Sequence, residues 1–145
     1  MNREIRRLAS LGPSGIAVLC RALLVLTRVR IALWVLPWNR VAAPAARSNV
    51  AGSARPGLDR LEWSVRTAGR FIPRSTCLTQ ALALQRLLSR YGYRSSVQIG
   101  VRNVDGRFGA HAWVEHQGSP LLSSAAEIAG YARFFSWPAS QLDLT

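Results

Sequence analysis

The sequence predicts an α+β domain in which helices come first and an antiparallel sheet follows. Up to residue 90, apolar side chains recur at helical spacing, and from residue 97 they alternate as in half-buried strands. Asp105-Gly106 and Gln117-Gly118 separate the predicted strands, as hairpin turns do. Helices that precede a meander of strands are typical of the α+β class.

Residues 16–36 form an apolar segment, IAVLCRALLVLTRVRIALWVL, that is long enough to cross a bilayer. Arg21, Arg28 and Arg30 interrupt it, and each costs about 2.5–3.5 kcal/mol near the centre of a membrane-spanning helix. We therefore expect no transmembrane span. The segment is predicted as one or two helices, ended by Pro37, that dock on the domain or on a partner. Shallow contact with a membrane surface is the alternative.

The stretch AAPAARSNVAGSARPG, rich in Ala, Pro, Gly and Ser, predicts a loop after these helices. We expect apolar, arginine-containing helices over residues 1–43, a linker over 44–57 and a core over 58–145, all within one compact domain. Inside that core, residues 58–70 are predicted as an amphipathic helix and residues 124–134 as a short helix.

The chain carries a net charge of +12, and all 19 of its basic residues are arginine. Such a charge attracts nucleic acid, anionic membranes or acidic peptides. The arginines are scattered and no DNA- or RNA-binding motif accompanies them, so we expect no nucleic-acid partner. Cys20 and Cys77 are too few for a disulfide framework, which favours the reducing cytoplasm. Neither a metal nor a cofactor is expected, and Cys20 is expected to be buried within its apolar helix.

Cys77 is a candidate nucleophile at the start of a predicted helix. Ser75 or Thr76 can cap this helix, and Gly92 is placed to end it. Cys77 begins an apolar stripe that continues through Ala81, Leu84 and Leu88. The positive end of a helix dipole stabilises a thiolate in the first turn, and backbone N–H groups there can face an oxyanion.

His111, in GAHAWVEHQG, is the candidate base. Alternation puts His111, Trp113 and Glu115 on one face of a strand. If the Cys77 helix packs on that face, the imidazole can take the proton of the thiol. The alternative is an inert buried cysteine with a structural histidine. Trp113 either lines a substrate groove or belongs to the core, and His116 is expected to be an exposed turn residue with no chemical role.

Residues 77–118, CLTQALALQRLLSRYGYRSSVQIGVRNVDGRFGAHAWVEHQG, resemble the transglutaminase-like cysteine peptidases that mature lasso peptides. The shared marks are CL at a helix start, LL before YGY, IGV on a strand and HAWVE before a turn glycine. The resemblance covers residues 73–120, and the apolar N-terminal segment also resembles that family. It implies a transglutaminase-like, papain-like cysteine protease fold with a Cys-bearing helix packed on a small antiparallel sheet.

The resemblance implies a cysteine peptidase that removes the leader peptide from a lasso precursor. The nucleophile carries over to Cys77 and the base to His111. The family places an acidic residue on the next strand, but aligning the turn at Gly118 puts Ser123 there instead. The implied partners are the precursor peptide, a separate leader-recognition protein and the ATP-dependent ring-closing cyclase. A non-catalytic relative that scaffolds a peptide-maturation complex is the alternative.

Overall fold

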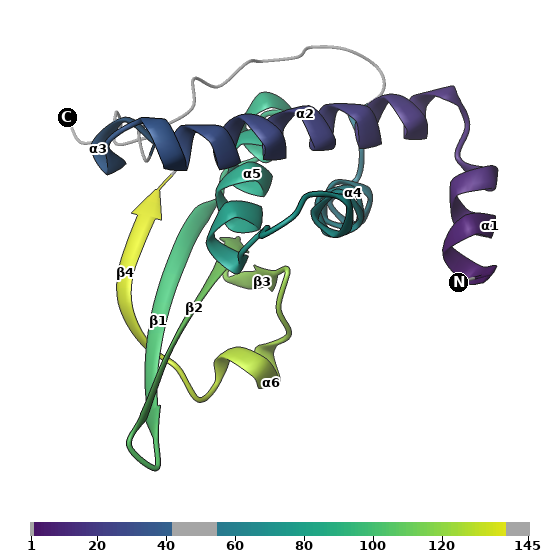
Figure 1. The fold of residues 1–145 in the computed structure, drawn as a ribbon. Coiled ribbons are helices and arrows are strands. Elements are labelled where there is room, and N and C mark those ends of the chain that lie inside the picture. Colours follow the sequence, from purple (N-terminus) through teal and green to yellow (C-terminus); the bar gives the residue numbers. More distant parts are fainter. Residues whose placement is uncertain (1, 42–54, 139–145) are drawn as a thin grey trace.

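The computed structural model describes residues 2–41 and 55–138, which form an α+β fold, as expected (Figure 1). Its helices are α1 (Asn2–Ser10), α2 (Pro13–Val35), α3 (Trp38–Val41), α4 (Leu58–Phe71), α5 (Cys77–Arg90) and α6 (Ala125–Ile128). Its strands are β1 (Ser96–Val104), β2 (Arg107–His116), β3 (Ser119–Leu121) and β4 (Ala132–Pro138).

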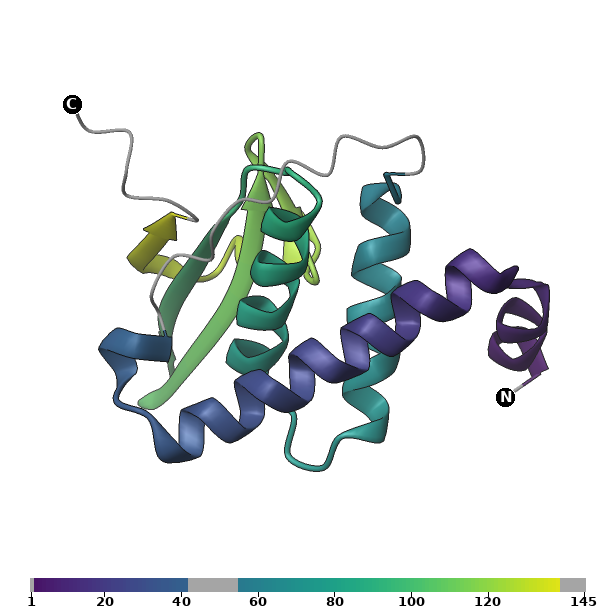
Figure 2. The ribbon, with the colours of Figure 1, turned by 90° about the horizontal axis from the view of Figure 1, so that it is seen from above.

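The helix α2 packs across both α4 and α5 (Figure 2). It buries one stripe of small and branched side chains, namely Gly15, Val18, Ala22, Leu26 and Val29. This stripe joins α4, α5 and the sheet in one hydrophobic core. The helix ends at Val35, shortly before Pro37, as the sequence predicted. Within the described ranges, no helix combines the length and apolar character that crossing a membrane requires.

The predicted linker over residues 44–57 falls mostly on residues 42–54, which lie outside the described part of the chain. After it, α4 begins at Leu58, as expected, and runs one residue further than the predicted end. The buried positions of α4 include Leu61, Val65 and Ala68, which recur at helical spacing.

The helix α5 is closed at both ends by local hydrogen bonds. The Thr76 hydroxyl oxygen accepts the N–H of Thr79 at 3.3 Å, which makes Thr76 the N-cap. At the other end, Gly92 has a φ of 78°, and its N–H donates to the Ser89 carbonyl at 3.1 Å. These caps fix Cys77 as the first residue of the helix.

The four strands form one antiparallel sheet in the order β3-β2-β1-β4. Both predicted hairpin turns are confirmed. Asp105 and Gly106 have φ values of 52° and 77°, and Gln117 and Gly118 have values of 50° and 78°. Two consecutive positive φ angles are characteristic of the type I′ turn, whose twist matches that of the flanking strands.

The C-terminal segment differs from the predicted helix over residues 124–134. The structure has a single helical turn, α6, followed by the strand β4, which pairs with β1. Ser124 and Glu127 form a capping box that starts α6. The strand forms because β1 would otherwise leave its outer edge of backbone N–H and C=O groups unpaired.

Gly100 on β1 tests how tightly the sheet packs beneath the C-terminal segment. A Cβ atom there would lie 2.8 Å from the Cβ of Tyr131 and 2.9 Å from the ring of Trp113. Gly100→Ala should therefore lower the free energy of unfolding by about 1–3 kcal/mol. Urea denaturation followed by circular dichroism measures this.

Gly109→Ala on β2 is the matched control, because its nearest contact would be 3.6 Å from the Arg102 side chain. This variant should keep the stability of the parent or gain up to about 1 kcal/mol. Equal stability of the two alanine variants would contradict the packing at Gly100.

Candidate functional site

His111 and Ser123 form the hydrogen bond at the centre of the site. The His111 Nε2 atom lies 2.7 Å from the Ser123 Oγ atom. His111 lies on β2, opposite Gly100 on β1. Pairing of β2 with β3 brings the chain back along β2, and Ser123 follows β3 by two residues. The structure thus brings together the predicted base and the residue predicted at the third position.

A pocket of about 340 Å³ opens beside this hydrogen bond. Its lining consists of Arg102, His111, Leu122, Ser123, Glu127 and Tyr131. The Tyr131 ring centroid lies 5.5 Å from that of His111, and the Arg102 guanidinium lies 4.8 Å from the Tyr131 ring centroid. The imidazole therefore faces a pocket whose lining includes the guanidinium of Arg102 and the carboxylate of Glu127.

Trp113 packs beside His111, with the two rings stacked at a centroid distance of 6.1 Å. The tryptophan is only 1% exposed. Its indole N–H donates to Glu115 at 3.2 Å, and Glu115 also pairs with Arg133 at 2.6 Å. This burial favours a core role for Trp113 over a groove-lining one, and it leaves Glu115 engaged away from His111.

The helix α5 does not pack on the strand face that carries His111. Ala112 and Val114 belong to the core that α5 joins, whereas His111 and Trp113 alternate to the other face of β2. The expectation that α5 covers the His111 face is therefore wrong. The reason is that Ala112, Val114 and their cross-strand neighbours offer the helix an apolar surface, whereas the opposite face carries polar side chains.

Cys77 is half-buried at the start of α5 and packs against the helical core. Among the described residues, no hydrogen bond joins its thiol to His111. Leu122 packs against the same core, and its N–H donates to Glu62 of α4 at 2.9 Å. The Leu122–Ser123 step therefore links the core that holds Cys77 to the imidazole on the other side of the sheet.

Glu127 is a residue of this site that the sequence reasoning missed. Its carboxylate accepts the backbone N–H of Ser124 at 2.7 Å and lines the pocket with His111. The bond from the Ser124 backbone, then that from the Ser124 hydroxyl, lowers the pKa of Glu127, with further lowering from the charges of His111 and Arg66. The capping-box spacing of Ser124 and Glu127 was the available signal.

The remaining histidine and cysteine lie outside this site. His116 is only partly exposed at the end of β2, and its Nδ1 atom is hydrogen-bonded to the Arg94 carbonyl. Cys20 was expected to be buried but is exposed, because it lies on the face of α2 opposite the buried stripe. Across residues 2–41 and 55–138, no cluster of His, Cys, Asp or Glu could hold a metal ion.

A model of the transglutaminase-like superfamily matches residues 23–136 of the chain. The chain belongs to the transglutaminase-like superfamily. Members of this superfamily are commonly cysteine peptidases or acyltransferases. The match begins within α2 and ends within β4, so the transglutaminase-like domain includes part of the N-terminal helical segment as well as the sheet. Comparisons with curated proteins and with solved structures find no significant match.

Glu127 gives the transglutaminase-like domain a testable dependence of stability on pH. A carboxyl whose pKa is lowered by folding stabilises the fold above its ordinary pKa of about 4.3, and this contribution is lost as pH falls through the folded value. Glu127→Gln should therefore be less stable than the parent at pH 7, and the difference should shrink below pH 4. Urea midpoints between pH 3 and 7 measure it. A difference that does not change with pH would contradict this origin.

Proposed function

We propose that this chain is a cysteine peptidase that removes the leader peptide from a lasso peptide precursor. The observation that carries the proposal is the 2.7 Å contact between His111 Nε2 and Ser123 Oγ. It occupies one ring nitrogen and, within the described residues, leaves Nδ1 without a hydrogen-bond partner. A histidine held in this way is suited to accept a proton through its second nitrogen. Membership of a superfamily that commonly contains cysteine peptidases supports the same reading.

In the proposed reaction, the Cys77 thiolate attacks the carbonyl carbon of the scissile peptide bond. His111 takes the thiol proton on Nδ1 and returns it to the leaving amine. Water, deprotonated by the same imidazole, then hydrolyses the thioester and releases Cys77. Ser123 accepts the Nε2–H bond throughout and so keeps the ring in one orientation. The carboxylate of Glu127 lines the same pocket as the imidazole.

The reaction requires the thiol and the imidazole to meet around the edge of the sheet. We propose that they do so beyond β3, which is only three residues long and ends where Leu122 turns with a φ of 67°. A short edge strand leaves room past its end that a full-length strand would fill. Ser123, directly after this turn, would then hold His111 at the edge of the sheet, beside the end of β3.

The partners of this reaction are also part of the proposal. The precursor peptide is the substrate, a separate recognition protein holds its leader, and the ring-closing cyclase acts on the product. A cytoplasmic setting suits the reaction because it keeps the thiol reduced.

The second candidate function is a non-catalytic module that scaffolds peptide maturation. The observation that favours it is that, among the described residues, no hydrogen bond joins the Cys77 thiol to His111. Reactivity of the thiol distinguishes the two candidates, because only the peptidase requires His111 to activate Cys77.

The first test of this function is the rate at which iodoacetamide alkylates Cys77 at neutral pH. An unactivated thiol, with a pKa of about 8.5, is only a few per cent ionised there, so His111→Ala should slow alkylation about tenfold. Peptide mass mapping separates Cys77 from the exposed Cys20, whose rate should not change and which serves as the internal control. Equal Cys77 rates in both proteins would favour the scaffolding module.

The second test is cleavage of a lasso precursor in the presence of its recognition protein. Cleavage should be abolished in Cys77→Ala, Cys77→Ser and His111→Ala. The two Cys77 variants lack the thiolate that attacks the carbonyl carbon. The His111 variant can neither activate the thiol nor protonate the leaving amine. Ser123→Ala should cost about one hydrogen bond, roughly a 2- to 10-fold loss of rate.

His116→Ala is the matched control, because this histidine lies on the same strand but contacts Arg94 instead of the pocket, and it should cleave as the parent does. Normal cleavage by His111→Ala with a dead Cys77→Ala would refute the proposed base. Normal cleavage by both would refute the peptidase.

A further inference from the structure

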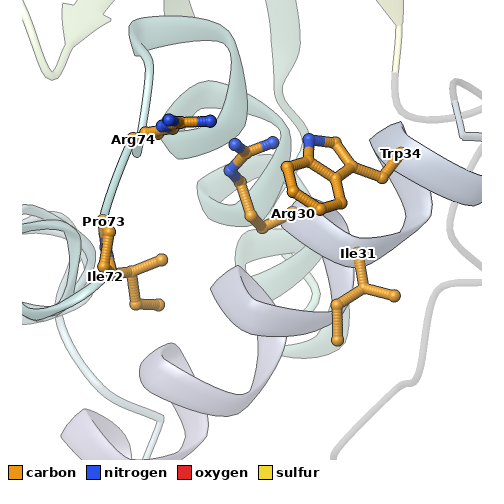
Figure 3. A pocket seen from close by; sticks show the side chains of 6 residues that line it. All are labelled: Arg30, Ile31, Trp34, Ile72, Pro73 and Arg74. Carbon is orange, nitrogen blue, oxygen red and sulfur yellow. The ribbon is translucent and has the colours of Figure 1, made fainter.

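A second pocket, of about 350 Å³, lies between α2 and the segment that leads into α5 (Figure 3). Its lining consists of Arg30, Ile31, Trp34, Ile72, Pro73 and Arg74. Four of these side chains are apolar. Figure 3 shows the two arginine side chains extending toward the same part of the pocket. This volume is within the range of sites that bind small ligands or single side chains.

Ile72 packs against the core, whereas the apolar wall that α2 contributes to this pocket is open to solvent. Trp34 is 74% exposed and Ile31 is 58% exposed. They continue a stripe on the outer face of α2 that includes Ile16 and Leu24 at helical spacing. Contiguous exposed apolar surface with an adjoining hollow is a mark of an interaction site.

The charge around the pocket is of one sign. The helix α2 contains Arg21, Arg28 and Arg30 and no acidic residue. Within the described residues, neither Arg30 nor Arg74 forms an ion pair, and the Arg30 guanidinium lies 5.0 Å from the Trp34 ring centroid. An occupant that carries carboxylates complements this surface. A second copy of the chain does not, because it would bring α2 arginines against α2 arginines.

Arg74 adds an independent observation. Its φ is 59°, in the left-handed region that a non-glycine residue enters at a cost. Glycine would adopt this backbone without strain, but the chain places a guanidinium there, at the rim of the pocket. Strain retained at a position that presents a charge to a hollow is typical of a binding site.

We propose that this pocket binds an acidic peptide segment that carries a large apolar side chain. The apolar side chain lies among Ile31, Trp34 and Pro73, and flanking carboxylates pair with Arg30 and Arg74. A concave hollow suits a single side chain better than it suits a flat bilayer surface. Because Arg74 precedes Cys77 by three residues, one wall of the pocket lies close in sequence to the start of α5. The inference concerns binding alone and does not depend on cleavage.

The test uses fluorescence anisotropy with the full chain carrying Cys77→Ala, so that no reaction can consume the peptide. The probe is a fluorescein-labelled 12-residue peptide with a central Leu-Glu-Trp-Glu in Gly-Ser flanks. Two control probes replace either both glutamates by lysine or both apolar residues by serine. The first probe should bind and the two control probes should bind at least tenfold more weakly. Equal binding of all three, or of none, would overturn the proposal.

Charge-reversal variants locate the site. Arg30→Glu with Arg74→Glu should weaken binding of the first probe at least tenfold. Arg28→Glu with Arg107→Glu makes the same change in net charge on exposed residues that do not line the pocket, and it should weaken binding less than threefold. If both double variants lose the same amount of affinity for the first probe, net charge alone explains the binding, and the proposed site is overturned.

Trp34→Ala removes an exposed side chain, so it tests the apolar wall with little risk to the fold. It should also weaken binding of the first probe at least tenfold, with an unchanged unfolding midpoint. Flotation with vesicles of equal parts phosphatidylglycerol and phosphatidylcholine tests the membrane alternative. Vesicle binding that requires Trp34, without peptide binding, would replace the peptide proposal by a membrane surface.

Discussion

The burial of α5 is the constraint on which the rest of the structure depends. This helix packs against α2 and α4 on one side and against the sheet on another. Its Ala81, Leu84 and Leu88 are fully buried. Burial of a large apolar side chain contributes about 1.5–3 kcal/mol, so the helix cannot leave this position without losing much of the core. Because Thr76 and Gly92 close the helix locally, its register along the core is fixed, and with it the place of the Cys77 thiol.

This constraint also decides which face of the sheet can carry polar chemistry. The apolar face of β2, with Ala112 and Val114, is taken by the core, and His111 and Glu115 lie on the opposite face. Gly100 leaves space there for the ring of Trp113 and the Cβ of Tyr131. The polar face is thus built around aromatic packing, and the imidazole lies at its border with the pocket. The chain joins the two sides at Leu122–Ser123, where the Leu122 N–H donates to Glu62 of α4 and Ser123 is hydrogen-bonded to His111.

The parts of the fold that the sequence predicted are those encoded by local interactions. The two type I′ turns depend on Asp105-Gly106 and Gln117-Gly118 alone, and the limits of α5 depend on its caps. Ser123 was expected at the third position from the family resemblance, aligned at the turn of Gly118, and its hydrogen bond to His111 lies beyond the paired residues of β3. In contrast, β4 forms because β1 offers it an edge, and its sequence ARFFSWP has no clear alternation. The side of the sheet that α5 covers is likewise set by tertiary packing. The capping-box spacing of Ser124 and Glu127 indicates their local pairing but not the approach of Glu127 to the pocket.

The helix α2 shows why apolar composition alone is ambiguous. It carries a buried stripe centred on Ala22 and Leu26, and a second, exposed stripe on the opposite side that ends at Trp34. When only hydropathy is considered, a helix that is apolar on both sides is predicted to span a membrane. Its arginines lie between the two stripes: Arg21 reaches the Tyr91 hydroxyl at 2.6 Å, while Arg30 lies over Trp34. The guanidinium groups of Arg21 and Arg30 thus each contact an aromatic side chain at a border between the stripes. The segment therefore has one side that completes the fold and another that is exposed to solvent.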